Sequence, residues 1–160
     1  MSNLVLDAPL QITLAAHGTP DYEALVALRQ EVLRAPLGLA FTPEQLAAED
    51  GSYHLGGYSG GVLAGCLVLR PLGGGRVQMQ QVAVRAGWQG RGVGRALVEH
   101  AETRARELGF GVMVLHARES AVGFYETLGY QKQGARFWEV TLPHWEMTKT
   151  LSRVDKNTVS

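Results

Sequence analysis

Apolar and polar positions near the start of the chain follow first a strand pattern and then a helical one. Residues 10–14 (Leu-Gln-Ile-Thr-Leu) alternate apolar and polar side chains, which is typical of a half-buried strand. Residues 19–21 (Thr-Pro-Asp) supply a hydroxyl N-cap, a proline at the first helical position and an acid in the first turn, so they predict a helix start. The apolar residues that follow have helical spacing, and this helix is expected to end at residues 34–38. Residues 42–48 begin with the capping-box spacing of a second, short helix.

The rest of the chain combines strand patterns with two longer helical patterns. Glycine-rich turns separate the strand candidates at 53–58, 62–72 and 77–84, which predicts an antiparallel meander. A continuous apolar run at 112–115 is typical of a strand covered on both faces. The expected elements are strands at 53–58, 62–72 and 77–84, a helix at 94–108, a strand at 112–115, a helix at 119–128 capped by Gly129, and strands at 130–138 and 146–151. This order predicts an α+β fold with a mostly antiparallel sheet, in which a strand-helix-strand unit supplies one parallel pair.

Length and composition fit one globular domain. The chain has 160 residues, of which 46% are hydrophobic and 19% charged, and this balance excludes a disordered or collagen-like chain. We expect a single domain over residues 1–151, long enough to bury about 70% of the surface of its unfolded chain. Residues 152–160 are a polar tail that we expect to be disordered.

The charge balance and the cysteine content exclude several classes of partner and site. The 15 Lys and Arg residues match 15 Asp and Glu residues, so no net field draws the chain to nucleic acid or to an anionic membrane. The single cysteine, Cys66, allows neither an internal disulfide nor a cysteine-cluster metal site, and no two histidines are spaced i, i+4, so we expect no metal. The N-terminus lacks the basic start of a secretory signal, and no apolar run reaches the ~20 residues of a membrane span. We therefore expect a cytoplasmic protein.

A glycine-rich segment joins the strand candidate at 77–84 to the helix that follows it. The chain has 20 glycines, and one cluster of them lies within residues 87–94. Gly90, Gly92 and Gly94 let the backbone approach a ligand closely, and N–H groups at the helix start can point together at an anion, helped by the helix dipole. Arginines within and beside the loop add positive charge. A diphosphate is the ligand that this arrangement favours.

Two common diphosphate-binding motifs do not match this loop. A P-loop needs Gly-x-x-x-x-Gly-Lys-Ser/Thr, and neither Lys-Ser nor Lys-Thr follows these glycines. The dinucleotide fingerprint needs Gly-x-Gly-x-x-Gly, whereas the spacing here is Gly90-x-Gly92-x-Gly94, after an antiparallel sheet. Both nucleotide-binding interpretations therefore fail on spacing and context.

Two sequence blocks carry the strongest functional signal. The first is Gln89-Gly90-Arg91-Gly92-Val93-Gly94. The second is Leu115-His116-Ala117-Arg118, followed by Ala121 and by Phe124-Tyr125-Glu126-Thr127-Leu128-Gly129-Tyr130. In type and order these blocks resemble the Gln/Arg-x-x-Gly-x-Gly/Ala loop and the Phe-Tyr helix of the GNAT superfamily of acyl-CoA-dependent N-acyltransferases. The match covers residues 62–151, and residues 10–50 fit by pattern only. It implies a three-layer α/β form of the α+β fold, with a mixed, mostly antiparallel sheet of about seven strands and about four helices.

The resemblance also implies a cosubstrate and the residues that bind it. Acetyl-CoA is expected, with its pantetheine arm paired to the strand before the loop and its pyrophosphate on the loop amides. The expected binding residues are Val82, Ala83, Val84, Gln89, Gly90, Arg91, Gly92, Val93, Gly94 and Arg95. Tyr125 occupies the family's general-acid position, where it would protonate the departing thiolate.

The general base is where this chain departs from the family pattern. Members often place Glu or His on the fourth strand, but the corresponding residues here are Gln78 and Gln80, which accept no proton near neutral pH. The remaining candidates, in order, are His144, His54, Glu139 and Glu119. His144 comes first because it lies in the last hairpin, which in this fold borders the acceptor. An amine that arrives neutral, or that loses its proton through ordered water, remains an alternative.

The sequence thus predicts an N-acetyltransferase that transfers acetyl from acetyl-CoA to a primary amine of a small molecule, by direct attack in a ternary complex. One alternative is a catalytically weak CoA-binding sensor or regulatory domain, which the missing acid on the fourth strand favours. Others are a longer acyl donor or an acceptor amine on a protein. The expected acceptor walls, 34–41 and 131–147, carry mixed charges without a clear acidic patch. A homodimer is possible, and the sequence does not choose between monomer and dimer.

Overall fold

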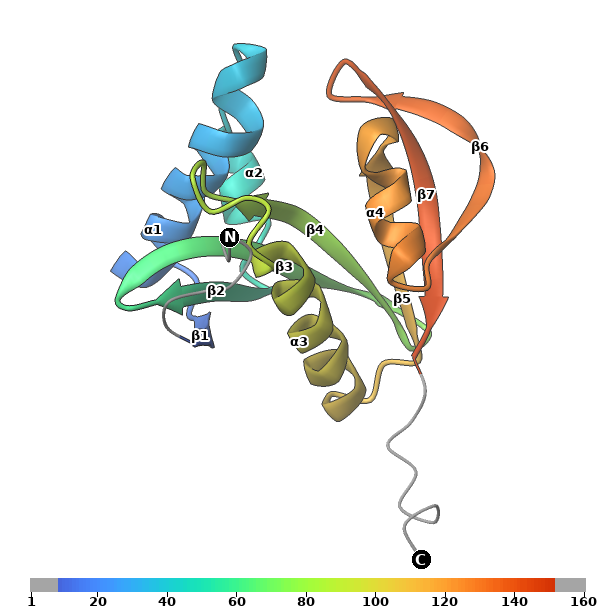
Figure 1. The fold of residues 1–160 in the computed structure, drawn as a ribbon, viewed down its shortest axis with the longest axis horizontal. Helices are drawn as coiled ribbons and strands as arrows, with labels where there is room; N and C mark the ends of the chain where they lie inside the picture. Colours follow the sequence, from blue (N-terminus) through green and yellow to red (C-terminus); the bar gives the residue numbers. More distant parts are fainter. Residues whose placement is uncertain (1–8, 152–160) are drawn as a thin grey trace, which may run out of the picture. The chain divides into compact units, whose positions relative to one another are not determined.

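The computed structural model describes residues 9–151, and strands and helices follow one another along them as the sequence predicts (Figure 1). The strands are β1 (Leu10–Ala15), β2 (Tyr53–Ser59), β3 (Val62–Gly73), β4 (Arg76–Val84), β5 (Val112–Arg118), β6 (Gln131–Glu139) and β7 (Leu142–Thr150). The helices are α1 (Pro20–Arg29), α2 (Pro43–Ala47), α3 (Val93–Glu107) and α4 (Val122–Thr127). A π-helical turn (Gln30–Arg34) and a 3₁₀ turn (Ala35–Leu37) continue α1, and a 3₁₀ turn (Glu119–Ala121) precedes α4. The tail expected at 152–160 lies outside the described residues.

The seven strands form one mixed sheet in the order β1-β2-β3-β4-β5-β7-β6. The pairs β1–β2, β2–β3, β5–β7 and β7–β6 are antiparallel. Strands β4 and β5, which flank α3 in the sequence, pair in parallel from Arg76↔Val112 to Met79↔Leu115. The mixed, mostly antiparallel α+β fold is therefore confirmed.

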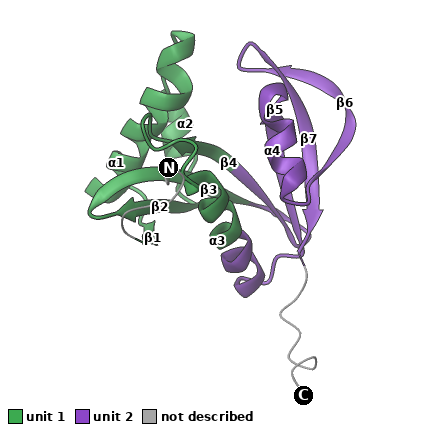
Figure 2. Ribbon diagram, viewed as in Figure 1, with its two compact units in different colours: residues 1–70, 80–101 green, residues 71–79, 102–160 purple. Residues whose placement is uncertain are grey.

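The described residues form two compact units (Figure 2). Unit 1 contains the chain up to Arg70 together with Gln80–Ala101, and so includes α1, α2, the end of β4 and the first part of α3. Unit 2 contains Pro71–Met79 and the chain from Glu102 onward, and so includes α4 and the strands β5, β6 and β7.

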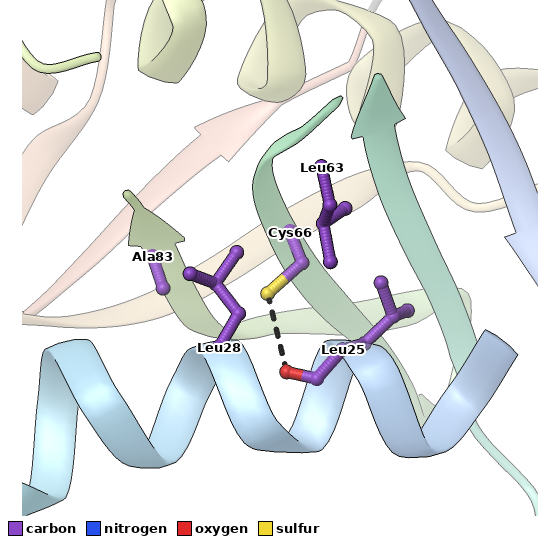
Figure 3. Close-up of a cluster of buried hydrophobic side chains, with 5 residues drawn as sticks. All are labelled: Leu25, Leu28, Leu63, Cys66 and Ala83. Carbon is purple, nitrogen blue, oxygen red and sulfur yellow. Dashed lines mark hydrogen bonds between the residues drawn. The ribbon is translucent and has the colours of Figure 1, made fainter. Parts of the chain in front are cut away.

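In unit 1, α1 packs its apolar stripe against the sheet. The helix begins as predicted, because Thr19 Oγ1 accepts a hydrogen bond from the Tyr22 amide and Pro20 occupies the first turn. A cluster of buried side chains joins Leu25 and Leu28 of the helix to Leu63 and Cys66 of β3 and to Ala83 of β4 (Figure 3). Ala83 is therefore fixed on the side of β4 that faces α1.

In unit 2, a buried carboxylate holds the end of α4. Gly129, at φ +95, closes the helix with the left-handed cap that the sequence predicted. Glu102 of α3 accepts a hydrogen bond from the Tyr130 hydroxyl at 2.8 Å and one from Lys149 Nζ at 2.9 Å. The same Nζ donates to the Leu128 carbonyl, so α4 ends at a fixed point of the unit.

Two strands extend by more than one residue beyond the ends that their sequence patterns predict. Strand β5 continues beyond its apolar run to Arg118, and β7 begins at Leu142 instead of residue 146. The hairpin turn between β6 and β7 is Val140-Thr141, at φ +51 and +64. Turn rules rely on glycine, asparagine or aspartate and therefore do not identify this pair. Proline is uncommon inside strands, so the proline at 143 argued against a strand at this position.

Candidate active site

The loop between β4 and α3 is shaped by glycines at positive φ. Gly87, Gly90 and Gly92 have φ of +89, +77 and +85, which other residues adopt at a cost. The Trp88 amide donates to the Arg85 carbonyl, and Gln89 Nε2 donates to the Val84 carbonyl at 3.2 Å, so the loop folds back on the end of the strand. A Cβ added at Gly90 or Gly92 would meet nothing within 4 Å, so open space faces the backbone there.

The start of α3 presents main-chain amides beside this space. The first amide to enter the helical ladder is that of Ala96, which donates to the Gly92 carbonyl. The amides of Val93, Gly94 and Arg95 therefore have no carbonyl one turn earlier and are available to an anion. Close packing fixes this end of the helix, since a Cβ on Gly65 would lie 2.7 Å from Leu97 and 3.0 Å from Val93.

The last residues of β4 have one edge turned away from β3. The Arg85 amide donates to the Ala64 carbonyl of β3, and the Ala83 carbonyl also lies beside β3. Because main-chain groups alternate along a strand, those of Val82 and Val84 face the opposite edge. Gln81 interrupts the strand just before them with φ +54. The end of β4 thus offers main-chain donors and acceptors at the position where the sequence predicted pantetheine binding.

The arginines around the loop differ in what they contact. Arg85 Nε donates to the Leu63 carbonyl, and its guanidinium lies 3.7 Å from Glu31, so this side chain is engaged within the fold. Arg91 stacks on the Trp88 ring at 4.5 Å, and the exposed Arg95 pairs with Glu99 at 3.2 Å. Because pairs this exposed are weak, Arg95 can exchange its partner for a phosphate at little cost.

These features fit the diphosphate of coenzyme A. Amides converge at the start of a helix of 15 residues, and the glycines leave room for the phosphates to approach. All ten residues expected to bind the cosubstrate, from Val82 to Arg95, lie within unit 1 and follow one another along the end of β4, the loop and the start of α3. The two expected catalytic residues, Tyr125 and His144, lie in unit 2.

Tyr125 lies in α4 with its ring buried. Only 7% of the residue is exposed, and the rings of Phe124 and Tyr130 lie edge-on to it at 5.0 and 5.8 Å. Burial raises the pKa of the Tyr125 phenol to about 12. The hydroxyl therefore keeps its proton throughout the neutral range.

His144 lies in β7, and one hydrogen bond defines its tautomer. Nδ1 is 2.9 Å from the Leu142 carbonyl oxygen, which can only accept, so Nδ1 carries the proton. In the neutral ring the basic lone pair is then on Nε2. This orientation suits a proton acceptor.

The other base candidates are engaged elsewhere. His54 is 2% exposed; burial lowers its pKa, and its Nε2 donates to the Glu49 carbonyl in unit 1. Glu119 lies 3.3 Å from Arg136. Glu139 lies 2.9 Å from Nδ1 of His116, a contact that the sequence analysis missed although His116 stands in the second sequence block. Strand alternation places His116 on the face opposite Leu115 and Ala117, but it does not identify Glu139 as its partner.

The described residues contain neither a candidate metal site nor a helix that could span a membrane. No group of three or more His, Cys, Asp or Glu side chains that could hold a metal ion occurs within residues 9–151. In the same range, no helix combines the length and the apolar character that crossing a membrane requires.

The acetyltransferase (GNAT) family model matches residues 22–130. The uncharacterized protein YyaT of Bacillus subtilis is 32% identical over 91 residues, which are 52% of this chain and 62% of that protein. The chain spans less than two thirds of the length of the first curated relatives that it matches.

Solved structures share the fold. A Lactobacillus plantarum protein, named provisionally as an N-acetyltransferase, superposes with a TM-score of 0.78 at 27% identity, over 89% of this chain and 99% of its own. A GNAT family acetyltransferase from Elizabethkingia anophelis, solved with acetyl-CoA bound, has a TM-score of 0.69 at 18% identity, over 89% and 98% of the two chains. At this lower identity the likeness concerns the fold alone.

Proposed function

The chain belongs to the acetyltransferase (GNAT) family, and from this premise we propose that it transfers an acetyl group from acetyl-CoA to a primary amine of a small molecule. The observation that carries the proposal is the loop before α3, with Gly90 and Gly92 at positive φ beside open space and with the helix amides behind them. The acetyl-CoA seen in the Elizabethkingia relative supports the same cosubstrate.

In the proposed complex, the main chain binds acetyl-CoA along its length. The amides from Gln89 to Arg95 hold the diphosphate, and the edge of β4 that faces away from β3 at Val82 and Val84 pairs with the pantetheine arm as a further strand would. The side chain of Ala83 is buried against α1, and this contact holds the end of β4 in place. Main-chain groups need no reorganisation on binding, so they place the thioester precisely enough for direct attack by an amine.

Tyr125 is the proposed general acid. As the amine nitrogen bonds to the acetyl carbon and the carbon–sulfur bond breaks, the phenol O–H donates its proton to the sulfur, and free coenzyme A leaves as the thiol. The apolar surroundings that keep Tyr125 protonated also raise the basicity of a thiolate formed beside it, so the transfer remains matched in energy.

His144 is the proposed base. Its Nε2 lone pair accepts a proton from the attacking nitrogen, while the Leu142 carbonyl holds the ring in the required tautomer. Gln78 and Gln80 do not serve in this role, because an amide side chain accepts no proton near neutral pH.

We place the reaction in the cytoplasm, since the one cysteine, Cys66, is a free and buried thiol, as is usual in a reducing compartment. A dimer of this chain is compatible with the proposal and is not required by it.

A screen of thiol release from acetyl-CoA tests the function. Amino acids, aminoglycosides, polyamines and peptides are each supplied as acceptor, and release of free coenzyme A is followed against a reaction without amine. We expect amine-dependent release with at least one class of small molecule. Binding of acetyl-CoA without release for any acceptor would contradict the proposal and favour the sensor alternative, which the glutamines at the usual base positions support.

A further inference from the structure

His116 lies between two carboxylates at the surface of unit 2. Its Nδ1 is 2.9 Å from Glu139 Oε1, and its Nε2 is 3.6 Å from Glu146 Oε1. Glu139 ends β6 just before the hairpin turn, and Glu146 is the residue directly opposite His116 in the β5–β7 ladder. With 29% of its side chain exposed, the imidazole can exchange protons with water.

The strand register places His116 on the same face as the proposed base. Arg118 pairs with His144 two positions along the ladder from the His116–Glu146 pair. Since side chains alternate along strands, these four residues share one face of the sheet. Phe137 of β6 contacts both imidazole rings, at 5.1 Å from His116 and 5.9 Å from His144.

The charges around His116 favour its protonated form. The hydrogen bond to Glu139 raises the pKa of His116 above its ordinary value, the charges of both carboxylates add to this, and partial burial opposes it. Of the other groups on this face, Arg118 and His144 lie two positions further along the ladder, and Glu119 is paired with Arg136. The raised pKa makes His116 a stronger base than an ordinary histidine.

The overall reaction needs a group that exports a proton. A primary amine in its ammonium form carries three protons on nitrogen, and the amide product keeps one. Of the two protons lost, one balances the proton that the coenzyme A sulfur gains, and the other must reach solvent. With a pKa of about 10.4, like that of lysine, fewer than roughly one alkylamine molecule in a thousand is neutral at pH 7. The first deprotonation is therefore a substantial part of the task.

We propose that His116, positioned by Glu139 and Glu146, accepts the proton that an ammonium acceptor loses before attack and passes it to solvent. The N–H bond of the ammonium group breaks, a new N–H bond forms on the imidazole, and water then removes that proton. His144 takes the second nitrogen proton during attack. This inference rests on the proposed acetyl transfer and assigns a second base to it.

A pair of acceptors of similar size and different basicity tests this role. Ethylamine is almost wholly ammonium at pH 7, whereas trifluoroethylamine is largely neutral there because fluorine withdraws electrons. Thiol release from saturating acetyl-CoA is measured with each amine for the wild type, for His116→Gln and for His100→Gln, a histidine of α3 outside the site. We expect His116→Gln to lower kcat/KM by roughly 10²-fold for ethylamine and by less than about twofold for trifluoroethylamine. His100→Gln should change neither value.

Equal losses for the two amines would indicate a structural role for His116, and unchanged rates would indicate none; either result overturns the inference. Glu139→Gln gives a second test that keeps the imidazole. Without this carboxylate the pKa of His116 falls, so the acidic limb of the ethylamine pH–rate profile should move to lower pH, and an unmoved limb would contradict the assignment. Wild-type protein that releases no thiol with either amine would instead contradict the proposed function itself.

Discussion

The ring of Tyr125 is buried and its hydroxyl stays protonated. The proposed acid chemistry depends on that hydroxyl alone. Tyr125→Phe removes the O–H and keeps the packing against Phe124 and Tyr130. We expect kcat to fall by roughly 10²-fold while the Kd of acetyl-CoA changes by less than about twofold, because the ring itself still fills its site. Tyr53→Phe in β2 is the matched control, and a Tyr125→Phe enzyme with wild-type kcat would remove the residue from the mechanism.

A buried ion pair governs stability in unit 1. Arg29, 1% exposed, donates two hydrogen bonds to Glu49, at 2.7 and 2.9 Å, and Tyr22 donates a third. Burial opposes ionisation of Glu49, but these hydrogen bonds and the charge of Arg29 outweigh it and lower the pKa of the carboxyl. Replacing Glu49 with Gln leaves a buried, unpaired guanidinium, so we expect the free energy of unfolding to fall by about 3 kcal/mol at pH 7.

The pH dependence of this effect follows from the lowered pKa. The stabilisation from Glu49 is complete above the carboxyl's unfolded-state pKa and is lost as the pH falls through the lower folded-state pKa. Urea unfolding at a series of pH values should therefore show a difference between wild type and Glu49→Gln that is constant near neutrality and shrinks in acid. A difference that grew in acid would contradict the assigned charge state.

Single residues with local signals could be predicted, and residues defined by distant contacts could not. Thr19 and Gly129 cap their helices as expected, because a cap depends on residues within one turn. The contact between His116 and Glu139 depends on the register of a hairpin 23 residues away, which composition and spacing do not encode. The role of Tyr125 as acid is still a prediction.

At the scale of elements, the loop before α3 can be tested by a matched pair of glycine substitutions. Gly92 and Gly74 both have positive φ, +85 and +62, and a Cβ at either would meet no atom within 4 Å. Alanine at either position should therefore cost about 1 kcal/mol of stability. Only the Gly92→Ala side chain would enter the expected phosphate site, so we expect the Kd of acetyl-CoA to rise about tenfold there and to stay unchanged in Gly74→Ala. Equal Kd values for the two variants would place the phosphates elsewhere.

Element boundaries were predictable where patterns are local and unpredictable where context decides. Helix α3 and the meander of β2, β3 and β4 occupy their expected places, because apolar periodicity and glycine turns define them. The β6–β7 turn places two β-branched residues, Val140 and Thr141, at positive φ, a conformation that only the surrounding hairpin imposes. The predicted start of β7 was wrong for this reason. His144 lies inside this strand, and the ladder fixes its neighbours.

At the scale of the whole molecule, the order of elements predicted the mostly antiparallel α+β architecture with one parallel pair, and the family resemblance implied the number of strands and helices. A parallel pair around α3 within an otherwise antiparallel arrangement allows few sheet orders, and the observed order agrees with the family resemblance. Neither the acceptor nor the oligomeric state follows from that order, because each depends on surface side chains whose chemistry varies on a common scaffold.

The central claim is that main-chain amides of Gln89 to Arg95 bind the diphosphate of coenzyme A, and calorimetric titration tests it directly. Acetyl-CoA is compared with S-acetylpantetheine, which keeps the thioester and the pantetheine arm and lacks the diphosphate together with the 3′-phosphoadenosine attached to it. We predict saturable heat with acetyl-CoA and binding at least roughly 10²-fold weaker with the truncated compound, since the phosphate contacts contribute most of the affinity. Equal affinity for the two compounds, or no heat with acetyl-CoA on folded protein, would contradict the account.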